Sequence, residues 1–153
     1  MKLPNGITGF YERYNEPPMI DGKQYKQICF NVIKNNGGTV IEFKEPNEKT
    51  NFFCVEVNVL NKHFYILLNA HYPLLAFASV VNFGEIDFYD EPHFKKEFSP
   101  FYSVLGTKEL NEPIIINSDS KSTIQNELNS AELKQLTYWK PERIGDVIFN
   151  YWD

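Results

Sequence analysis

The chain has 153 residues and a formal net charge of −5, and 42% of its residues are hydrophobic. This length fits one domain, residues 1–153, and the composition is that of a folded rather than a disordered protein. The negative charge argues against non-specific nucleic-acid binding, which depends on Lys and Arg neutralising phosphates. No segment approaches the roughly 20 apolar residues of a membrane span, and the first residues lack the apolar run of a signal peptide. We therefore expect a cytoplasmic protein that binds neither nucleic acid nor a membrane.

Aromatic residues are abundant, with 13 Phe, 9 Tyr and 2 Trp. Phe is normally a core residue, but Tyr is amphipathic, and nine tyrosines cannot all be interior. We therefore expect some exposed aromatic surface. Cys29 and Cys54 are the only cysteines. Their apolar neighbours predict two buried free thiols rather than a disulfide or a zinc site.

The N-terminal part contains one well-defined helix, from about Gly22 to Asn35. Its apolar residues recur at the spacing of one helical face, so this face needs a sheet to pack on. Asp21 is placed to cap the start, and Gly37-Gly38 to end it. Before this helix, Ile7 to Phe10 is interpreted as a short strand.

Alternation of apolar and polar residues predicts a strand from Thr39 to Lys44. This alternation places Ile41 and Phe43 on one face, and Val40 and Glu42 on the other. The strand leads through a polar loop into a predicted hairpin.

The strongest structural signal is a hairpin from Phe52 to Ala70, with Asn61-Lys62 as its two-residue turn. That turn predicts the pairs Val59/Phe64, Val57/Ile66, Val55/Leu68 and Phe53/Ala70, with all eight side chains on one apolar face. The opposite face is mixed and half polar, with Glu56, Asn58, His63 and Tyr65. It is the face left for solvent, a second helix or a partner.

Further elements are predicted from 73 onwards. Residues 73–83 are apolar on both faces, and we favour a buried strand over a short helix. A strand over 85–89 and a helix starting at Pro92 follow. Ile114 to Ile116 is interpreted as a brief strand, and residues 117–122 as a polar surface loop.

The C-terminal part begins with a possible helical turn over Ile124 to Leu128. Asn129 and Glu132 have the spacing of a capping box, which predicts a helix ended by Pro141. Alternation from Val147 to Trp152 predicts a terminal strand. Together these elements predict an α+β fold: a predominantly antiparallel sheet with the first helix and the C-terminal helix packed on it.

The stretch 84–94 is the most site-like part of the chain, with four carboxylates and one imidazole. Asp87, Asp90, Glu91 and the neighbouring Tyr89 form a candidate acidic binding patch for a protein. Two neighbouring carboxylates can also divide acid and base roles or bind a hard cation, although the spacing matches no calcium loop. The structural alternative, which we favour, is the solvent face of an edge strand that leads into a helix N-terminus.

We interpret both tryptophans as core residues. Trp139, beside Lys140-Pro141 at a helix end, is the one that can also anchor an interface. The remaining inventory disfavours an enzyme, because it offers no histidine–cysteine metal spacing, no phosphate loop and no nucleophile elbow. We predict no cofactor and no metal.

The ending ELKQLTYWKPERIGDVIFNYWD and the opening LPNGITGFY resemble small uncharacterised proteins of Gram-positive bacteria. Several such groups are thought to include immunity proteins that neutralise polymorphic toxins. The resemblance covers about a fifth of the chain, mainly its two ends. It implies a small, acidic, single-domain protein without catalytic apparatus.

These observations lead to three hypotheses from different classes. The leading one is an immunity-type or antitoxin-type module that binds a basic toxin through Asp87, Tyr89, Asp90, Glu91 and Trp139. The second is a metal-dependent or small-molecule enzyme that uses the cluster at 85–93. The third is a homo-oligomeric structural protein.

Overall fold

The computed structural model describes residues 1–115 and 125–152 and shows the predicted α+β fold. Five strands follow one another across the sheet as an antiparallel meander, and a short sixth strand pairs in parallel with the start of the fourth. The predicted strand over 73–83 is confirmed as β4. The strands are β1 (Thr39–Lys44), β2 (Phe52–Val59), β3 (Lys62–Asn69), β4 (Leu74–Asn82), β5 (Glu85–Tyr89) and β6 (Ser103–Val104). The helices are α1 (Gly22–Asn35), α2 (Pro92–Phe98), α3 (Thr107–Leu110), α4 (Ser130–Trp139) and α5 (Ile144–Ile148).

Helix α1 begins and ends as its sequence predicts. The Asp21 carboxylate accepts hydrogen bonds from the backbone N–H groups of Lys23 and Gln24, and Gly37 adopts a φ of +75° just after the last turn. The side chains on one face of the helix pack against the sheet. They are Tyr25, Cys29 and Ile33, all fully buried.

The β2–β3 hairpin exists, but its turn and register differ from the prediction. The turn residues are Leu60-Asn61, with φ of 52° and 60°, and the pairs are Val59/Lys62, Val57/Phe64, Val55/Ile66 and Phe53/Leu68. Positive φ at both turn positions gives the hairpin a type I′ turn, whose twist matches that of the strands. In the observed register, each β2 residue pairs with the β3 residue two positions before the predicted one. Because side chains alternate between faces with a period of two, every side chain keeps its predicted face.

A β-bulge in β1 overturns the predicted alternation of that strand. The register with β2 shifts between Val40 and Glu42, which leaves Ile41 without a partner residue and 48% exposed. Val40 and Phe43 consequently both pack towards α1. One extra residue in a strand moves the following side chains to the opposite face, which simple alternation does not anticipate.

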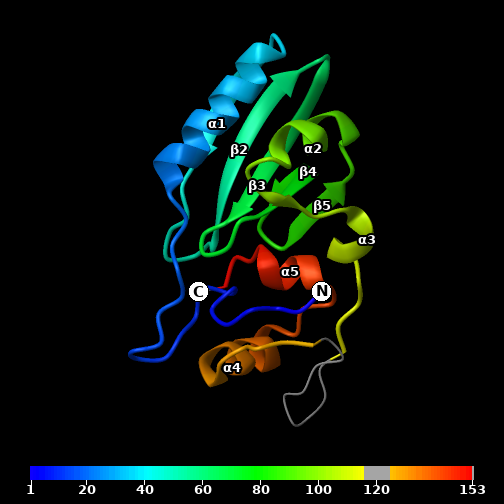
Figure 1. The fold of residues 1–153 in the computed structure, drawn as a ribbon. Helices are drawn as coiled ribbons and strands as arrows, with labels where there is room; N and C mark the ends of the chain where they lie inside the picture. Colours follow the sequence, from blue (N-terminus) through cyan, green and yellow to red (C-terminus); the bar gives the residue numbers. More distant parts are fainter. Residues whose placement is uncertain (116–124, 153) are drawn as a thin grey trace.

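The sheet separates two hydrophobic cores. On one face, α1 and α2 cover Val55, Val57 and the other apolar hairpin residues. On the opposite face, a second core joins Phe52, Leu67 and neighbouring sheet residues to α3, α5 and the N-terminal segment. Figure 1 shows α5 and both chain ends near one end of the sheet, with α4 beyond them.

The C-terminal segment is not the predicted strand. Residues 144–148 form helix α5, and residues 149–152 belong to no helix or strand. The apolar residues of this segment fit both the alternation of a strand and the spacing of a helix. Ile144, Val147 and Ile148 stand at positions i, i+3 and i+4, which is one face of a helix. Asn150 N–H donates to Asn51 Oδ1 at 2.8 Å, which holds this segment beside the start of β2.

Three other local predictions are wrong, and two of their segments extend beyond the described residues. Residues 7–10 form turns rather than a strand, because Gly6 and Gly9 adopt φ of +84° and +93°. Ile114 and Ile115 are not in a strand, and Asn126 forms an isolated bridge with Leu3 instead of a helical turn. Ile116, Ile124 and the predicted loop at 117–122 lie outside the described residues.

No helix in the described ranges is long and apolar enough to cross a membrane.

Candidate interaction surface

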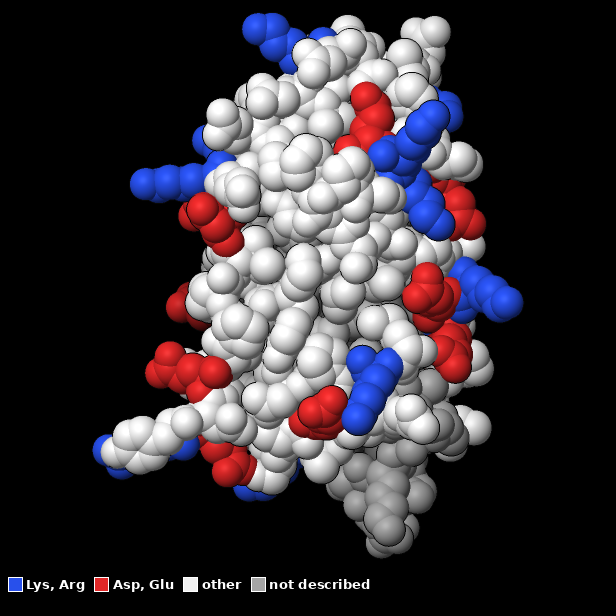
Figure 2. All heavy atoms as spheres, in the orientation of Figure 1, with Lys and Arg blue, Asp and Glu red and all other residues white. Residues whose placement is uncertain are grey.

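Figure 2 shows one face of the molecule, on which charged side chains gather along the margins and leave the centre largely uncharged. The negative charge of the chain is therefore not gathered into one patch on this face.

The side chains of Asp87 and Asp90 have different environments. Asp87 is exposed on β5, whereas Asp90 accepts hydrogen bonds from the Thr107 backbone N–H at 2.9 Å and from the Thr107 hydroxyl at 2.8 Å. These two bonds lower the pKa of the Asp90 carboxyl. Asp90 thus holds the start of α3.

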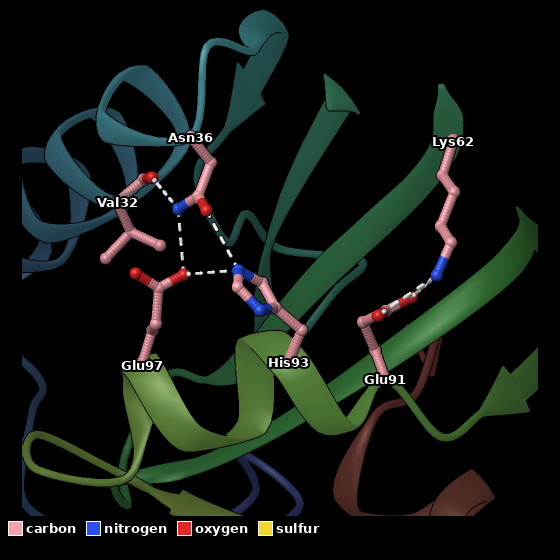
Figure 3. Close-up of polar contacts among 6 residues, drawn as sticks. All are labelled: Val32, Asn36, Lys62, Glu91, His93 and Glu97. Carbon is pink, nitrogen blue, oxygen red and sulfur yellow. Dashed lines mark hydrogen bonds and ion pairs between the residues drawn. The ribbon is translucent and has the colours of Figure 1, made fainter. Parts of the chain in front are cut away.

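Glu91 is 4% exposed and is held by two neighbours. Lys62 Nζ, from the start of β3, lies 3.2 Å from its carboxylate (Figure 3). The Tyr89 hydroxyl donates to the same group at 3.1 Å. Burial, and secondly this carboxylate, raise the pKa of Tyr89. Glu91 therefore fastens the end of β5 to β3, and its charge is balanced inside the fold.

His93 belongs to a third arrangement, which joins α1 to α2 (Figure 3). Its Nε2 lies 2.8 Å from Asn36 Oδ1 and 3.2 Å from Glu97 Oε2, while Asn36 Nδ2 donates to Glu97 and to the Val32 carbonyl. Both neighbours of Nε2 are acceptors, so this nitrogen carries the hydrogen. Within the described ranges no group of three or more His, Cys, Asp or Glu side chains is arranged to hold a metal ion.

An open pocket of about 400 Å³, which we call the tryptophan pocket, lies between the β4–β5 turn, the end of α4 and the C-terminal segment. Trp139 and Trp152 stack in it with parallel rings 6.4 Å apart, and the Phe83 and Tyr151 rings meet at 5.8 Å. Phe83 is 75% exposed, because the two-residue turn that carries it projects from the sheet.

A second pocket of about 330 Å³, which we call the sheet pocket, lies on the mixed face of the hairpin. Tyr65, Cys54 and Glu56 line it, and Tyr151 is a wall of both pockets. We call the two together the aromatic groove. The predicted mixed face is thus covered by α5 at one end and open at the other.

Negative charge dominates the lining of the groove. Its two lysines, Lys44 and Lys140, stand beside six carboxylates. Three of these lie within 4.0 Å of a basic side chain: Glu42 beside Lys44, Glu56 beside the His63 imidazole, and Asp146 beside Arg143. The other three form no ion pair with any described residue; they are Glu45, Glu85 and Glu142.

The ionisable groups in the groove other than carboxylates and lysines are neutral at pH 7. Burial raises the pKa of the Cys54 thiol to about 12 and that of the Tyr151 hydroxyl to about 12. Cys29, on the other face of the sheet, is raised to about 12 for the same reason. Because a thiolate and not a thiol is the nucleophile, neither cysteine is activated for covalent chemistry.

The structure brings one of the five predicted binding residues, Trp139, into the groove. The others, Asp87, Tyr89, Asp90 and Glu91, do not line it. Phe83 and Tyr151 were not among the binding residues predicted from the sequence. A Phe next to a turn glycine such as Gly84 does, however, indicate an exposed aromatic side chain. Comparison of the chain with protein-family models, curated proteins and solved structures gives no match.

Proposed function

We propose that the protein is a non-enzymatic binding module of the immunity type, which neutralises a basic partner protein by occluding its surface. The observation that carries this proposal is the aromatic groove with its excess of carboxylates. Aromatic side chains dominate the energetically important centres of protein interfaces, and surrounding charges steer a partner of opposite sign.

The apolar surface next to the groove favours a protein over a small ligand. Phe83 is 75% exposed at the mouth of the tryptophan pocket, and Tyr138, 76% exposed, contacts the Trp139 ring at 5.1 Å. These rings extend beyond the pockets, so an occupant that covers them must be larger than the pockets themselves. Large apolar side chains exposed beside a pocket are a feature of interaction sites.

The test is capture of a partner from the native host, followed by titration with any toxin encoded beside the gene. Phe83→Ser should weaken binding at least about tenfold, because it removes an aromatic anchor. Phe101→Ser is the matched control, since Phe101 is also exposed but does not line the groove. Recovery of no specific partner, together with failure to protect cells that express the toxin, would contradict the proposal.

A further inference from the structure

The tryptophan pocket combines aromatic walls with carboxylates at its rim. The walls are the rings of Phe83, Trp139, Tyr151 and Trp152, and Glu85, Glu142 and Asp146 contribute acidic groups. An aromatic face attracts a cation through its quadrupole, most strongly when the ring is tryptophan. Rings and carboxylates together therefore favour a positively charged occupant.

Two of these carboxylates are available to a ligand. Glu85 and Glu142 are exposed, and no described residue forms an ion pair with either. The one lysine in the lining, Lys140, is exposed at the end of α4. Asp146 is engaged by Arg143, whose Nε lies 3.0 Å from its Oδ1. The pocket thus has a local excess of negative charge.

The fold already contains the same combination beside this pocket. The Arg143 guanidinium lies 4.8 Å from the centre of the Phe88 ring while it also donates to Asp146. A planar guanidinium can stack on a ring and pair with a carboxylate at once, which an ammonium does less well. The neighbouring rings and carboxylates offer a second guanidinium comparable surroundings.

We infer that the tryptophan pocket receives an arginine side chain of the partner protein, stacked on its aromatic walls and paired with Glu142 and Glu85. This inference rests on the proposed function and names the chemistry that the groove recognises. The aliphatic part of the arginine packs along the rings, and the guanidinium reaches the acidic rim. The occupant is a partner protein, because Phe83 continues the apolar surface outside the pocket.

The experiment is calorimetric titration of the full chain with an acetylated, amidated Gly-Arg-Gly peptide. The control peptide carries citrulline, which has nearly the same shape as arginine but no charge. The arginine peptide should bind at least about tenfold more tightly, and added salt should weaken it. Intrinsic fluorescence gives a second readout, because both tryptophans of the chain lie in this pocket.

Two variants with equal charge changes locate the binding. Glu85→Gln with Glu142→Gln removes two rim carboxylates and should weaken the arginine peptide about tenfold or more. Asp87→Asn with Glu16→Gln removes two exposed carboxylates outside the pocket and should leave binding within about twofold. All four positions are exposed, so both variants are expected to fold, and circular dichroism checks this.

Three results would overturn the inference: equal binding of the citrulline and arginine peptides, no binding of either peptide, or equal effects of the two double variants. If a partner is nevertheless captured in a manner sensitive to Phe83→Ser, the proposed function stands and the arginine pocket alone is rejected. If no partner depends on Phe83 although arginine binds with the predicted selectivity, the proposed function fails instead.

Discussion

Glu132 shows how much one buried side chain organises at the residue scale. It is fully buried, and its carboxylate accepts hydrogen bonds from the Gly6 N–H at 2.6 Å, the Thr8 N–H at 2.9 Å and the Thr8 hydroxyl at 2.6 Å. It also completes the capping box with Asn129. The capping box follows from local spacing, but the contacts with residues 6 and 8 join chain segments more than 120 residues apart.

Replacing this carboxylate tests its role. Glu132→Gln should lower the free energy of unfolding by about 2–4 kcal/mol, because it removes a charged acceptor and turns an amide NH₂ towards N–H donors. Chemical denaturation measures the change. Glu127→Gln is the control, since Glu127 is exposed and, among the described residues, forms its ion pair with Lys2 at 3.4 Å. Equal stabilities of the two variants would show that the Glu132 contacts contribute little.

At the scale of single elements, the spacing of apolar residues predicted the helices and strands that bury one face and expose the other. Helix α1, β1 and β5 have the predicted bounds. The predicted position of the hairpin turn was wrong because Leu60 occupies a position that favours Gly or Asn, so its residue type does not indicate a turn. The prediction for α5 was wrong because its five residues are too few to distinguish helical spacing from strand alternation.

The turn itself makes a prediction. Leu60 adopts a φ of 52° and is 50% exposed, so its side chain adds strain without much burial. Leu60→Asn should raise the free energy of unfolding by about 0.5–1 kcal/mol, because Asn tolerates this conformation better. Leu60→Val should lower it, since a β-branched residue tolerates it least. Urea denaturation of the three proteins would disagree with the assigned turn if the order were reversed.

At the scale of the whole molecule, the groove exists because distant segments meet. Residues of the β4–β5 turn, the end of α4 and the C-terminal segment form the tryptophan pocket, and β1 to β4 with Tyr151 form the sheet pocket. No local spacing encodes this meeting. The acidic stretch at 85–93 looked site-like because its residues are close in sequence, yet Asp90, Glu91 and His93 contact three different parts of the fold.

We propose that the aromatic groove, and not the acidic edge at residues 87–91, binds a basic protein surface. The most direct test is a ¹H–¹⁵N NMR titration of the full chain with a peptide of alternating arginine and glycine. We expect saturable shifts of the Trp139 and Trp152 indole signals, with the amides of Asp87, Asp90 and Glu91 unchanged. Shifts confined to those three amides, with both indole signals unmoved, would contradict it.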